Sequence, residues 1–258
     1  MRLKLKLYSK EKVFIPINYQ HFLSSIIYNF LAESNLNFST QLHEGIHLKS
    51  PKKFKFFTFS WLQIQNKKII KDQIQIASED FYWYISSPWE EFLYNFLNGL
   101  LKTTEIRIGN NNFQILQVET LKDFELLHSR VKFKCLSPIA ITTKKEYDGR
   151  LIKYYYKPSD NKYEISEKIR RNLINKYTAY FGKTPSDDKL FINFDENYLK
   201  SSKSQVLVHY IKEDMDIKIP AIMCPFEVEG SKELIKFGYE CGFGELNSAG
   251  FGMVEIFK

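Results

Sequence analysis

The first residues of the chain alternate between leucine and positively charged side chains. Leu3, Leu5 and Leu7 alternate with Arg2, Lys4 and Lys6. A period of two residues is typical of a β-strand, because successive side chains point to opposite faces of a sheet. The pattern therefore predicts an N-terminal strand with one buried face and one basic face.

A helical period follows this strand, over residues 19–32. Its apolar stripe consists of Tyr19, Phe22, Leu23, Ile26, Ile27, Phe30 and Leu31. Asn18 precedes the pattern and is a candidate N-cap. Tyr28 lies about 150° from the centre of the stripe, at 3.6 residues per turn. We therefore expect a helix that buries its stripe and leaves the Tyr28 ring on another face.

The rest of the first half predicts four further strands and a second helix. The strands are expected at residues 54–62, 81–86, 105–108 and 113–118, and the helix at residues 87–101. The helix start is the clearest signal, because Ser87 can cap it, Pro88 fits its first turn, and Glu90 completes a capping box. With the last two strands as one hairpin, the order is strand, helix, strand, strand, helix, strand. This is the ferredoxin-like order, which RNA-recognition domains also use.

The second half of the chain repeats this scheme less regularly. Strands are expected at residues 130–136, 205–211, 217–228 and 252–257, and helices at residues 165–181 and from residue 231 onward. Gly182 suits the end of the longer helix, and residues 122–129 form a candidate junction between the halves. We therefore predict an α+β protein with two tandem ferredoxin-like (RRM-like) domains, at residues 1–122 and 126–258.

Composition and charge narrow the class of protein. The 258 residues are 44% hydrophobic, which is enough for a packed core. The formal net charge of +7 favours a polyanionic partner, because clustered Lys and Arg attract phosphate groups and release counterions. The basic face of the first strand could contact such a partner, or it could serve only to prevent aggregation.

The cysteines and the lack of long apolar runs indicate the cellular compartment of the protein. Cys135, Cys224 and Cys241 have no close spacing, which suits reduced thiols and neither a disulfide framework nor a zinc site. The N-terminal segment has no apolar signal core, and no run of about 18 apolar residues is present. We therefore expect a cytoplasmic protein without a membrane span.

A glycine-rich segment lies close to the C-terminus of this glycine-poor chain. Its candidate contacts to a nucleic-acid backbone are Gly242, Gly244, Asn247, Ser248, Gly250 and Gly252. Glycine permits positive φ angles and close approach of another backbone, and successive N–H groups can cradle a phosphate. The alternative is a tight structural hairpin without a ligand. A dinucleotide fingerprint and a nucleotide P-loop both fail, because a helix precedes the loop and no Gly-Lys-Ser/Thr ending is present.

The same segment carries a resemblance to a known family. Residues 238–254, Gly-Tyr-Glu-Cys-Gly-Phe-Gly-Glu-Leu-Asn-Ser-Ala-Gly-Phe-Gly-Met-Val, resemble the C-terminal signature of the CRISPR precursor-RNA-processing endoribonucleases of the RAMP superfamily. Ile-Ile-Tyr-Asn at 26–29, Leu-His-Glu at 42–44, Phe-Thr-Phe-Ser at 57–60 and Leu-Ser-Pro-Ile-Ala at 136–140 resemble further family segments, in the family's order. Non-catalytic relatives share the glycine signature, whereas the Leu-His-Glu and Phe-Thr-Phe-Ser segments indicate the nuclease branch. The resemblance implies two tandem ferredoxin-like domains, in agreement with the order of elements.

Cleavage of RNA without a metal ion uses the RNA's own 2′-hydroxyl as the nucleophile. Histidine suits the proton transfers because its pKa lies close to working pH. Lysine suits the charge of the phosphorane, and tyrosine can donate a hydrogen bond. The resemblance implies that His43, in its Leu-His-Glu context, is the catalytic histidine. It implies that Lys55, two places before Phe-Thr-Phe-Ser, is the catalytic lysine. Tyr28 matches the tyrosine in the family's first helix. No metal or other cofactor is implied.

One departure from the family pattern leaves alternatives open. His43 and Lys55 are separated by more residues than is usual in the family, and the additional stretch contains His47, Lys52 and Lys53. Lys52 or Lys53 could therefore supply the catalytic charge in place of Lys55. His47 could replace or assist His43, although only His43, in a polar and loop-prone stretch, has the family context.

The resulting hypothesis is a metal-independent endoribonuclease that cuts the repeat in CRISPR transcripts to make guide RNAs, leaving 2′,3′-cyclic phosphate and 5′-hydroxyl ends. One alternative is a non-catalytic RAMP protein that binds repeat RNA as a structural subunit. Another is a plain RNA-recognition module, which would need exposed aromatics on a central strand, such as those of residues 81–84. CRISPR repeat RNA is the expected partner. A CRISPR effector complex is left open as a further partner, and so is the choice between monomer and homodimer.

Overall fold

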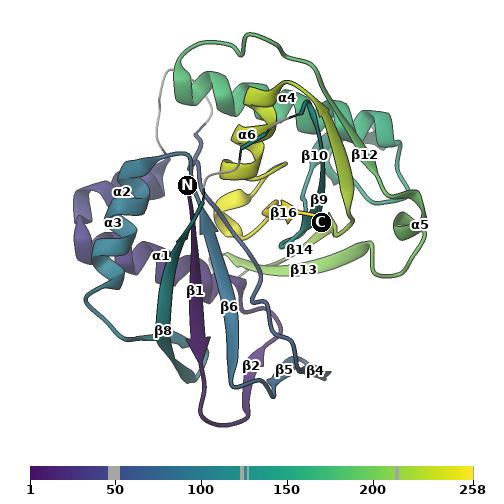
Figure 1. The fold of residues 1–258 in the computed structure, drawn as a ribbon. Helices are drawn as coiled ribbons and strands as arrows, with labels where there is room; N and C mark the ends of the chain where they lie inside the picture. The colour runs from purple at the N-terminus through teal and green to yellow at the C-terminus, as the bar shows by residue number, and fades with distance from the viewer. Residues whose placement is uncertain (46–52, 123–124, 127, 213–214, 258) are drawn as a thin grey trace.

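The computed structural model describes residues 1–45, 53–122, 125–126, 128–212 and 215–257. The chain forms two neighbouring antiparallel sheets, each covered by helices on one face (Figure 1). None of the helices in these ranges is long and apolar enough to cross a membrane. The predicted α+β class with two ferredoxin-like halves is confirmed by the order of strands in each sheet.

The first half is built on a sheet with the strand order β3-β6-β1-β8-β7. Its elements are β1 (Arg2–Tyr8), α1 (Gln20–Ser34), α2 (Leu36–Glu44), β3 (Thr58–Phe59), β6 (Asp80–Ser86), α3 (Glu90–Leu100), β7 (Glu105–Ile108) and β8 (Asn111–Leu121). β1 lies at the centre, between β6 and β8, as the ferredoxin-like order requires. A small separate sheet is made of β2 (Val13–Pro16), β4 (Lys67–Ile70) and β5 (Gln73–Ile76).

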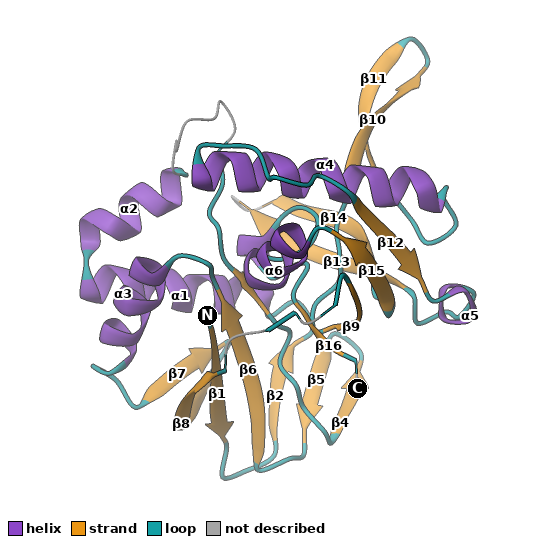
Figure 2. Cartoon of the chain, turned by 45° about the horizontal axis from the view of Figure 1, so that its top comes forward, coloured by secondary structure: helices purple, strands orange, loops and turns teal. Residues whose placement is uncertain are grey.

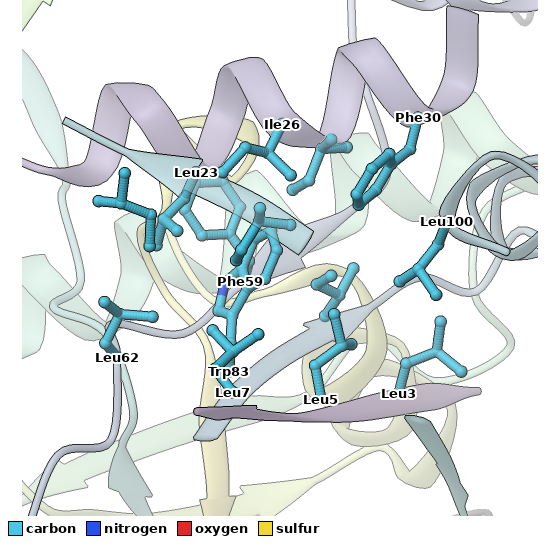
Figure 3. Packing of buried hydrophobic residues seen from close by; sticks show 14 of the residues in the cluster. Leu3, Leu5, Leu7, Leu23, Ile26, Phe30, Phe59, Leu62, Trp83 and Leu100 are labelled. Carbon is cyan, nitrogen blue, oxygen red and sulfur yellow. The ribbon is translucent and has the colours of Figure 1, made fainter. Parts of the chain in front are cut away.

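The core of the first half lies between this sheet and its helices. Leu3, Leu5 and Leu7 on β1 have no exposed surface and belong to one apolar cluster with Leu23 of α1 and Trp83 of β6 (Figure 3). The period of two predicted for β1 is therefore confirmed. Since each buried leucine removes a whole side chain from water, this alternation stabilises the sheet by about 1.5–3 kcal/mol per residue.

The opposite face of β1 is less basic than the sequence alone indicates. Lys4 and Lys6 form ion pairs with Glu119 and Asp80 on the neighbouring strands, with N–O distances of 3.6 and 2.6 Å. Each carboxylate offsets one positive charge. The arrangement fits the alternative in which charged side chains cover the open face of the sheet.

The strand expected at residues 54–62 is wrong in extent, because only Thr58 and Phe59 form a regular strand there, β3. The chain turns at Phe56, which has a positive φ of 48° and packs its ring into the core of the second half. Such a φ is strained for a bulky residue and is incompatible with a strand. The turn leaves Lys55 outside the sheet, where its side chain can face a neighbouring helix.

Two local predictions near the first helix are also corrected. The N-cap position of α1 is Tyr19 and not Asn18, and no side chain caps this helix. The loop-prone stretch around His43 is the last turn of α2, whose N-terminus is capped by the Asn35 side chain. A short helix that carries few apolar residues has weak periodicity, so the polar composition concealed it.

The second half forms a four-stranded sheet in the order β12-β15-β9-β16. Its elements are β9 (Arg130–Cys135), α4 (Lys162–Phe181), β12 (Leu190–Phe194), α5 (Glu196–Leu199), β15 (Phe226–Gly230), α6 (Lys232–Cys241), the short 3-10 helix η1 (Asn247–Ala249) and β16 (Val254–Ile256). This is the ferredoxin-like order again, and α4 and α6 contribute to the core that covers the sheet. α4 ends at Gly182 in the left-handed conformation, as predicted.

Two hairpins outside this sheet differ from the predicted scheme. β13 (Gln205–Lys212) pairs with β14 (Met215–Ile222), and β10 (Thr142–Tyr147) pairs with β11 (Arg150–Tyr155). The single strand expected at residues 217–228 is wrong, because it joins the end of β14 to the start of β15 across Pro225, which has no N–H to donate. The β10–β11 hairpin stands away from the body of the molecule (Figure 2) and was not predicted.

The two halves meet where residues 242–252, named here the glycine loop, pack on β3. The Thr58 hydroxyl donates a hydrogen bond to the carbonyl oxygen of Phe251 at 2.9 Å. Gly250 has a φ of +84° and lies so close to the Phe59 ring that a Cβ would come within 2.6 Å of it. Only glycine allows this approach, so the loop of the second half is seated directly on the first.

A buried arginine makes a further connection between the halves. Arg2 donates from Nη1 to the carbonyl oxygen of Val254 at 2.7 Å and from Nη2 to that of Tyr239 at 2.9 Å. Its guanidinium also lies 3.8 Å from the centre of the Tyr239 ring. This part of the basic face of β1 therefore contacts protein and not a ligand. The domain bounds 1–122 and 126–258 stay a prediction.

The packing of the glycine loop predicts a stability difference between two glycine positions. Gly252 has a φ of +77°, and a Cβ there would overlap the carbonyl oxygen of Phe243. Gly149, in the β10–β11 turn, has a similar φ of +72° and no atom within 4 Å of the same position. Both alanine variants carry about 1–2 kcal/mol of left-handed backbone strain, and only Gly252→Ala adds an overlap with backbone.

We therefore expect Gly252→Ala to lower the free energy of unfolding by at least about 2 kcal/mol more than Gly149→Ala. Urea denaturation followed by circular dichroism measures both values. Equal losses in the two variants would show that the loop relaxes around an added methyl group, and would contradict the tight packing described here.

Candidate active site and cleft

Tyr28 and His43 come together because two helices are joined by a single residue. α1 ends at Ser34 and α2 begins at Leu36, so α2 folds back beside the C-terminal half of α1. The Ser39 hydroxyl on α2 donates to the carbonyl oxygen of Tyr28 at 3.2 Å. The half-buried Tyr28 ring meets the His43 ring edge-on, with centroids 5.2 Å apart and planes inclined at 71°. As predicted, Tyr28 lies off the buried stripe of α1.

Lys55 reaches the same place from the segment before β3. Its Nζ donates a hydrogen bond to the Tyr28 hydroxyl oxygen at 2.8 Å and lies 5.0 Å from the centre of the Tyr28 ring. Tyr28 therefore contacts both other candidate residues. The structure brings Tyr28, His43 and Lys55 together from three different segments of the chain.

The structure places only some of the residues that could replace His43 or Lys55. His43 is exposed in the last turn of α2, which ends at Gly45 with a φ of +85°. His47 and Lys52 lie outside the described residues, so they are not placed relative to His43. Lys53 is described, and its side chain packs against Gly45. Of the described lysines, Lys55 is the one that donates to Tyr28.

The glycine loop, in the second half of the chain, faces the group formed by Tyr28, His43 and Lys55. Its glycines are required by internal packing, since a Cβ on Gly244 would lie 2.6 Å from the carbonyl oxygen of Ala140 and one on Gly242 would lie 2.5 Å from the Asn247 amide. Some N–H groups are also used internally, such as that of Glu245, which donates to Ala140 at 2.8 Å. The alternative of a tight structural loop without a ligand therefore explains why glycine is needed at these positions. A role of the loop in RNA binding stays a prediction.

Asn247 and Ser248 differ in what they can offer a ligand. The Asn247 amide donates to the carbonyl oxygens of Phe243 at 3.2 Å and Phe251 at 3.0 Å, and its oxygen accepts from Lys176 at 2.9 Å. Both ends of this amide are engaged within the protein. Asn247 and Ser248 both line the cleft in front of the loop.

Lys176 is a structural residue that the sequence did not single out. The buried ammonium, on α4, donates to Asn247 and to the carbonyl oxygens of Gly242 at 2.7 Å and Gly244 at 3.0 Å. Burial lowers the pKa of this ammonium group. A lysine in a polar helix normally extends into solvent, so only the fold shows that this one holds the glycine loop.

A cleft of about 560 Å³ separates the candidate active site from the glycine loop. Its walls are residues 53–57, the α4 residues Asn172, Asn175 and Lys176, and residues 244–248. Three of the lining residues are lysines and one is a glutamate, so the formal charge of the lining is positive. A concave, positively charged surface beside candidate acid–base residues suits an extended polyanion.

The remaining potential ligands and nucleophiles lie apart from this cleft or are buried. In the part of the chain that the structure describes, no three His, Cys, Asp or Glu side chains are grouped as metal ligands. Cys135 and Cys224 are free thiols whose burial raises their pKa to about 12. Such thiols stay protonated at neutral pH and are poor nucleophiles.

Known proteins similar to this chain were found by both sequence and structure. Models of the CRISPR-associated protein Cas6 match residues 14–119 for its N-terminal part and 119–256 for its C-terminal part. The chain is 38% identical to the CRISPR-associated endoribonuclease Cas6 1 of Methanocaldococcus jannaschii, over 98% of this chain and 92% of that protein. A solved structure described as a Cas6-related gene product from Pyrococcus furiosus matches with a TM-score of 0.84 at 30% identity, covering 100% of this chain and 98% of that chain. A structure described as a RAMP protein binding different RNA substrates matches with a TM-score of 0.82 at 28% identity, over the whole of both chains.

The segments that carried the sequence resemblance border one region of the fold. Leu-His-Glu ends α2, Phe-Thr-Phe-Ser contains β3, and the glycine signature forms the loop that packs on β3. Phe57 and the glycine loop line one cleft, and His43 lies beside it through its contact with Tyr28. Together with the two family models, which cover nearly the whole length, these matches show that the chain belongs to the CRISPR-associated Cas6 family.

Proposed function

We propose that this protein is an endoribonuclease that cuts CRISPR repeat RNA in precursor transcripts to make guide RNAs. The observation that carries the proposal is the meeting of Tyr28, His43 and Lys55 beside a positively lined cleft. The relative that is 38% identical is named an endoribonuclease, which supports the same activity here. The structure described as an RNA-binding RAMP protein supports RNA as the ligand of the cleft.

In the proposed reaction, the RNA's own 2′-oxygen attacks the adjacent phosphorus atom, and the bond from phosphorus to the 5′-oxygen breaks. The 2′-hydroxyl loses a proton, and the leaving 5′-oxygen gains one. The products therefore carry a 2′,3′-cyclic phosphate and a 5′-hydroxyl. The enzyme has to move protons and to stabilise the phosphorane, and the balance requires no metal ion.

The three residues are suited to different parts of this reaction. His43 is proposed to transfer protons, since its exposed imidazole at the end of α2 can reach an incoming strand. The Lys55 ammonium is proposed to stabilise the negative charge of the phosphorane. The Tyr28 hydroxyl, whose oxygen accepts a hydrogen bond from Lys55, is proposed to contact a phosphate oxygen of the RNA.

The two alternative functions, a plain RNA-recognition module and a non-catalytic RAMP protein, receive less support from the described residues. An RNA-recognition module would need exposed aromatic side chains on a central strand. Phe81 and Trp83 of β6 are buried in the core and cannot stack on bases. Tyr82 points to the other face, where the Lys4 ammonium lies 4.5 Å from the centre of its ring. The non-catalytic RAMP alternative differs from our proposal by the lack of a working histidine. A CRISPR effector complex as a further partner, and the choice between monomer and homodimer, stay predictions.

The proposed role of His43 predicts a loss of rate without a loss of binding. His43→Ala should slow cleavage of the repeat RNA by at least about a hundredfold, the low end for a lost general acid or base. Affinity should change little, because the lysines that line the cleft remain to attract phosphate. Single-turnover assays at saturating enzyme measure the rate, and titration of a 2′-deoxy repeat RNA measures the affinity.

Two further histidine variants serve as comparisons for His43→Ala. His128→Ala removes an exposed histidine outside the cleft and should cleave at the wild-type rate. His47→Ala should slow cleavage by no more than about tenfold if His47 only positions RNA. The opposite ranking of His43 and His47 would move the assignment to His47, and equal large losses would divide the acid and base roles between them. A wild-type protein that binds the repeat without cutting it would support the non-catalytic alternative.

The nucleophile is tested by changing one atom of the RNA. A single 2′-deoxy substitution immediately upstream of the scissile phosphate should block cleavage while binding persists, because the attacking oxygen is missing. The intact RNA, assayed in excess EDTA, should be cut at the same rate as without the chelator. Cutting of the 2′-deoxy RNA at the same phosphate would indicate a water nucleophile, and activity that needs added magnesium would overturn the metal-free mechanism.

A further inference from the structure

The outer face of α3 carries large apolar side chains that the proposed cleavage does not use. α3 lies on the outer side of the first half (Figure 1), where Tyr94 and Leu101 are 66% and 77% exposed. Leu101 is the C-cap residue and keeps helical dihedral angles. The two residues are seven positions apart, which is about two turns, so they project from one face of the helix. Neither lines the cleft, so this face, named here the α3 face, is a separate surface of the molecule.

The start of α2 adds a further apolar residue to this region. Leu36, the first residue of α2, is 66% exposed. The nearby Phe38 ring packs on the ring of Trp89, with centroids 4.9 Å apart, and Trp89 directly precedes α3. The start of α2 therefore lies beside the start of α3. Single exposed apolar residues are common on protein surfaces, whereas a group of them on neighbouring elements is typical of an interface.

Opposite charges lie at the two ends of the α3 face. Glu90 and Glu91 form the first turn of α3, Lys102 follows its C-cap residue, and all three side chains are exposed. The Lys102 ammonium donates to the backbone carbonyl oxygen of Glu33, a neutral acceptor that leaves its charge available. Glutamates at a helix N-terminus also favour the helix itself, so they identify no partner by themselves. Combined with the apolar residues between them and Lys102, they make a surface whose two ends are complementary in charge.

We propose that the α3 face is the contact surface of a symmetric homodimer, in which α3 packs antiparallel on α3 of a second copy. A two-fold interface needs one surface that is complementary to itself, and antiparallel packing gives the α3 face such a match. Tyr94 then packs on the partner's Leu101. In the same register, Glu91 lies about 3 Å along the helix axis from the level of the partner's Lys102, within reach of an ion pair. Parallel packing would instead bring the glutamates of both copies together.

The length of α3 limits the strength of this dimer. Its 11 residues span about 16 Å, so the contact buries less surface than the roughly 1,200–2,000 Å² of a standard stable interface. We therefore expect a dissociation constant on the order of 10 μM and a dimer whose population depends on protein concentration. The contact uses no residue that lines the cleft.

Sedimentation velocity of the full chain, purified free of RNA, tests the dimer. The wild-type protein should shift from monomer to dimer between about 1 and 200 μM. Leu101→Ser should raise the dissociation constant by at least about tenfold, because it removes the side chain on which Tyr94 packs. Leu151→Ser, at a 69% exposed position of the β10–β11 hairpin, is the matched control and should associate as the wild type does. Circular dichroism checks the fold of each variant, and Leu101→Gln takes the place of Leu101→Ser if that variant does not fold.

Charge reversal tests the antiparallel arrangement. Glu91→Lys and Lys102→Glu should each raise the dissociation constant by at least about fivefold, because each brings like charges together across the interface. The double variant restores opposite charges at both ends of the contact and should associate within about twofold of the wild type. Weaker association of the double variant than of either single variant would contradict the antiparallel pairing.

A single cysteine near the two-fold axis gives an independent test. Asn98 lies about midway between Tyr94 and Leu101 on α3, so in the dimer it meets the same residue of the second copy. Asn98→Cys should form a disulfide-linked dimer on treatment with diamide, which takes up the two electrons and two protons of the thiols. Tyr163→Cys, at an 87% exposed position of α4, is the control and should stay monomeric on a non-reducing gel.

Two further results would overturn the inference. One is a wild-type protein that stays monomeric at about 200 μM, which would leave the α3 face to a different partner. The other is a dimer that Leu101→Ser and both charge reversals leave unchanged, which would place the contact on another surface. These measurements contain no RNA, so the inference does not rest on the proposed function and can fail without affecting it.

Discussion

The seam between the glycine loop and β3 is the contact on which the rest of the site depends. Thr58 and Phe251 share a hydrogen bond there, and the Phe59 ring lies against Gly250 where no Cβ fits. Because β3 pairs with β6, the loop of the second half is fixed to the main sheet of the first. Lys55 is three residues before Thr58, so the same seam positions the candidate phosphate-binding charge.

On each side of the cleft, a lysine that lines it also fixes other polar groups. On one side, Lys55 orients the Tyr28 hydroxyl, and on the other Lys176 holds three acceptors of the glycine loop. Polar groups fixed before a ligand arrives need no reorganisation during the reaction, which is how preorganised sites lower a barrier. The two ammonium groups therefore have different tasks: Lys55 can meet a phosphate, whereas Lys176 is committed to the protein.

The elements with strong periodicity could be predicted from the sequence, and those defined by long-range contacts could not. The alternation of β1 and the off-stripe place of Tyr28 follow from local geometry and agree with the structure. The turn at Phe56 is set by a core that lies in the other half, so residues 54–62 misleadingly resembled one strand. The candidate catalytic residues were identified by family resemblance. Lys176 gave no signal, because its hydrogen bonds to the glycine loop exist only in the folded molecule.

The two walls of the cleft come from distant parts of the chain. The candidate catalytic side chains all precede Phe56, whereas α4 and the glycine loop follow much later. Under the proposed function, substitutions that abolish cutting need not disturb the opposite wall of the cleft. Such substitutions would turn a protein that cuts RNA into one that only binds it. After a gene duplication, a copy of that kind would compete with the cutting copy for the same RNA.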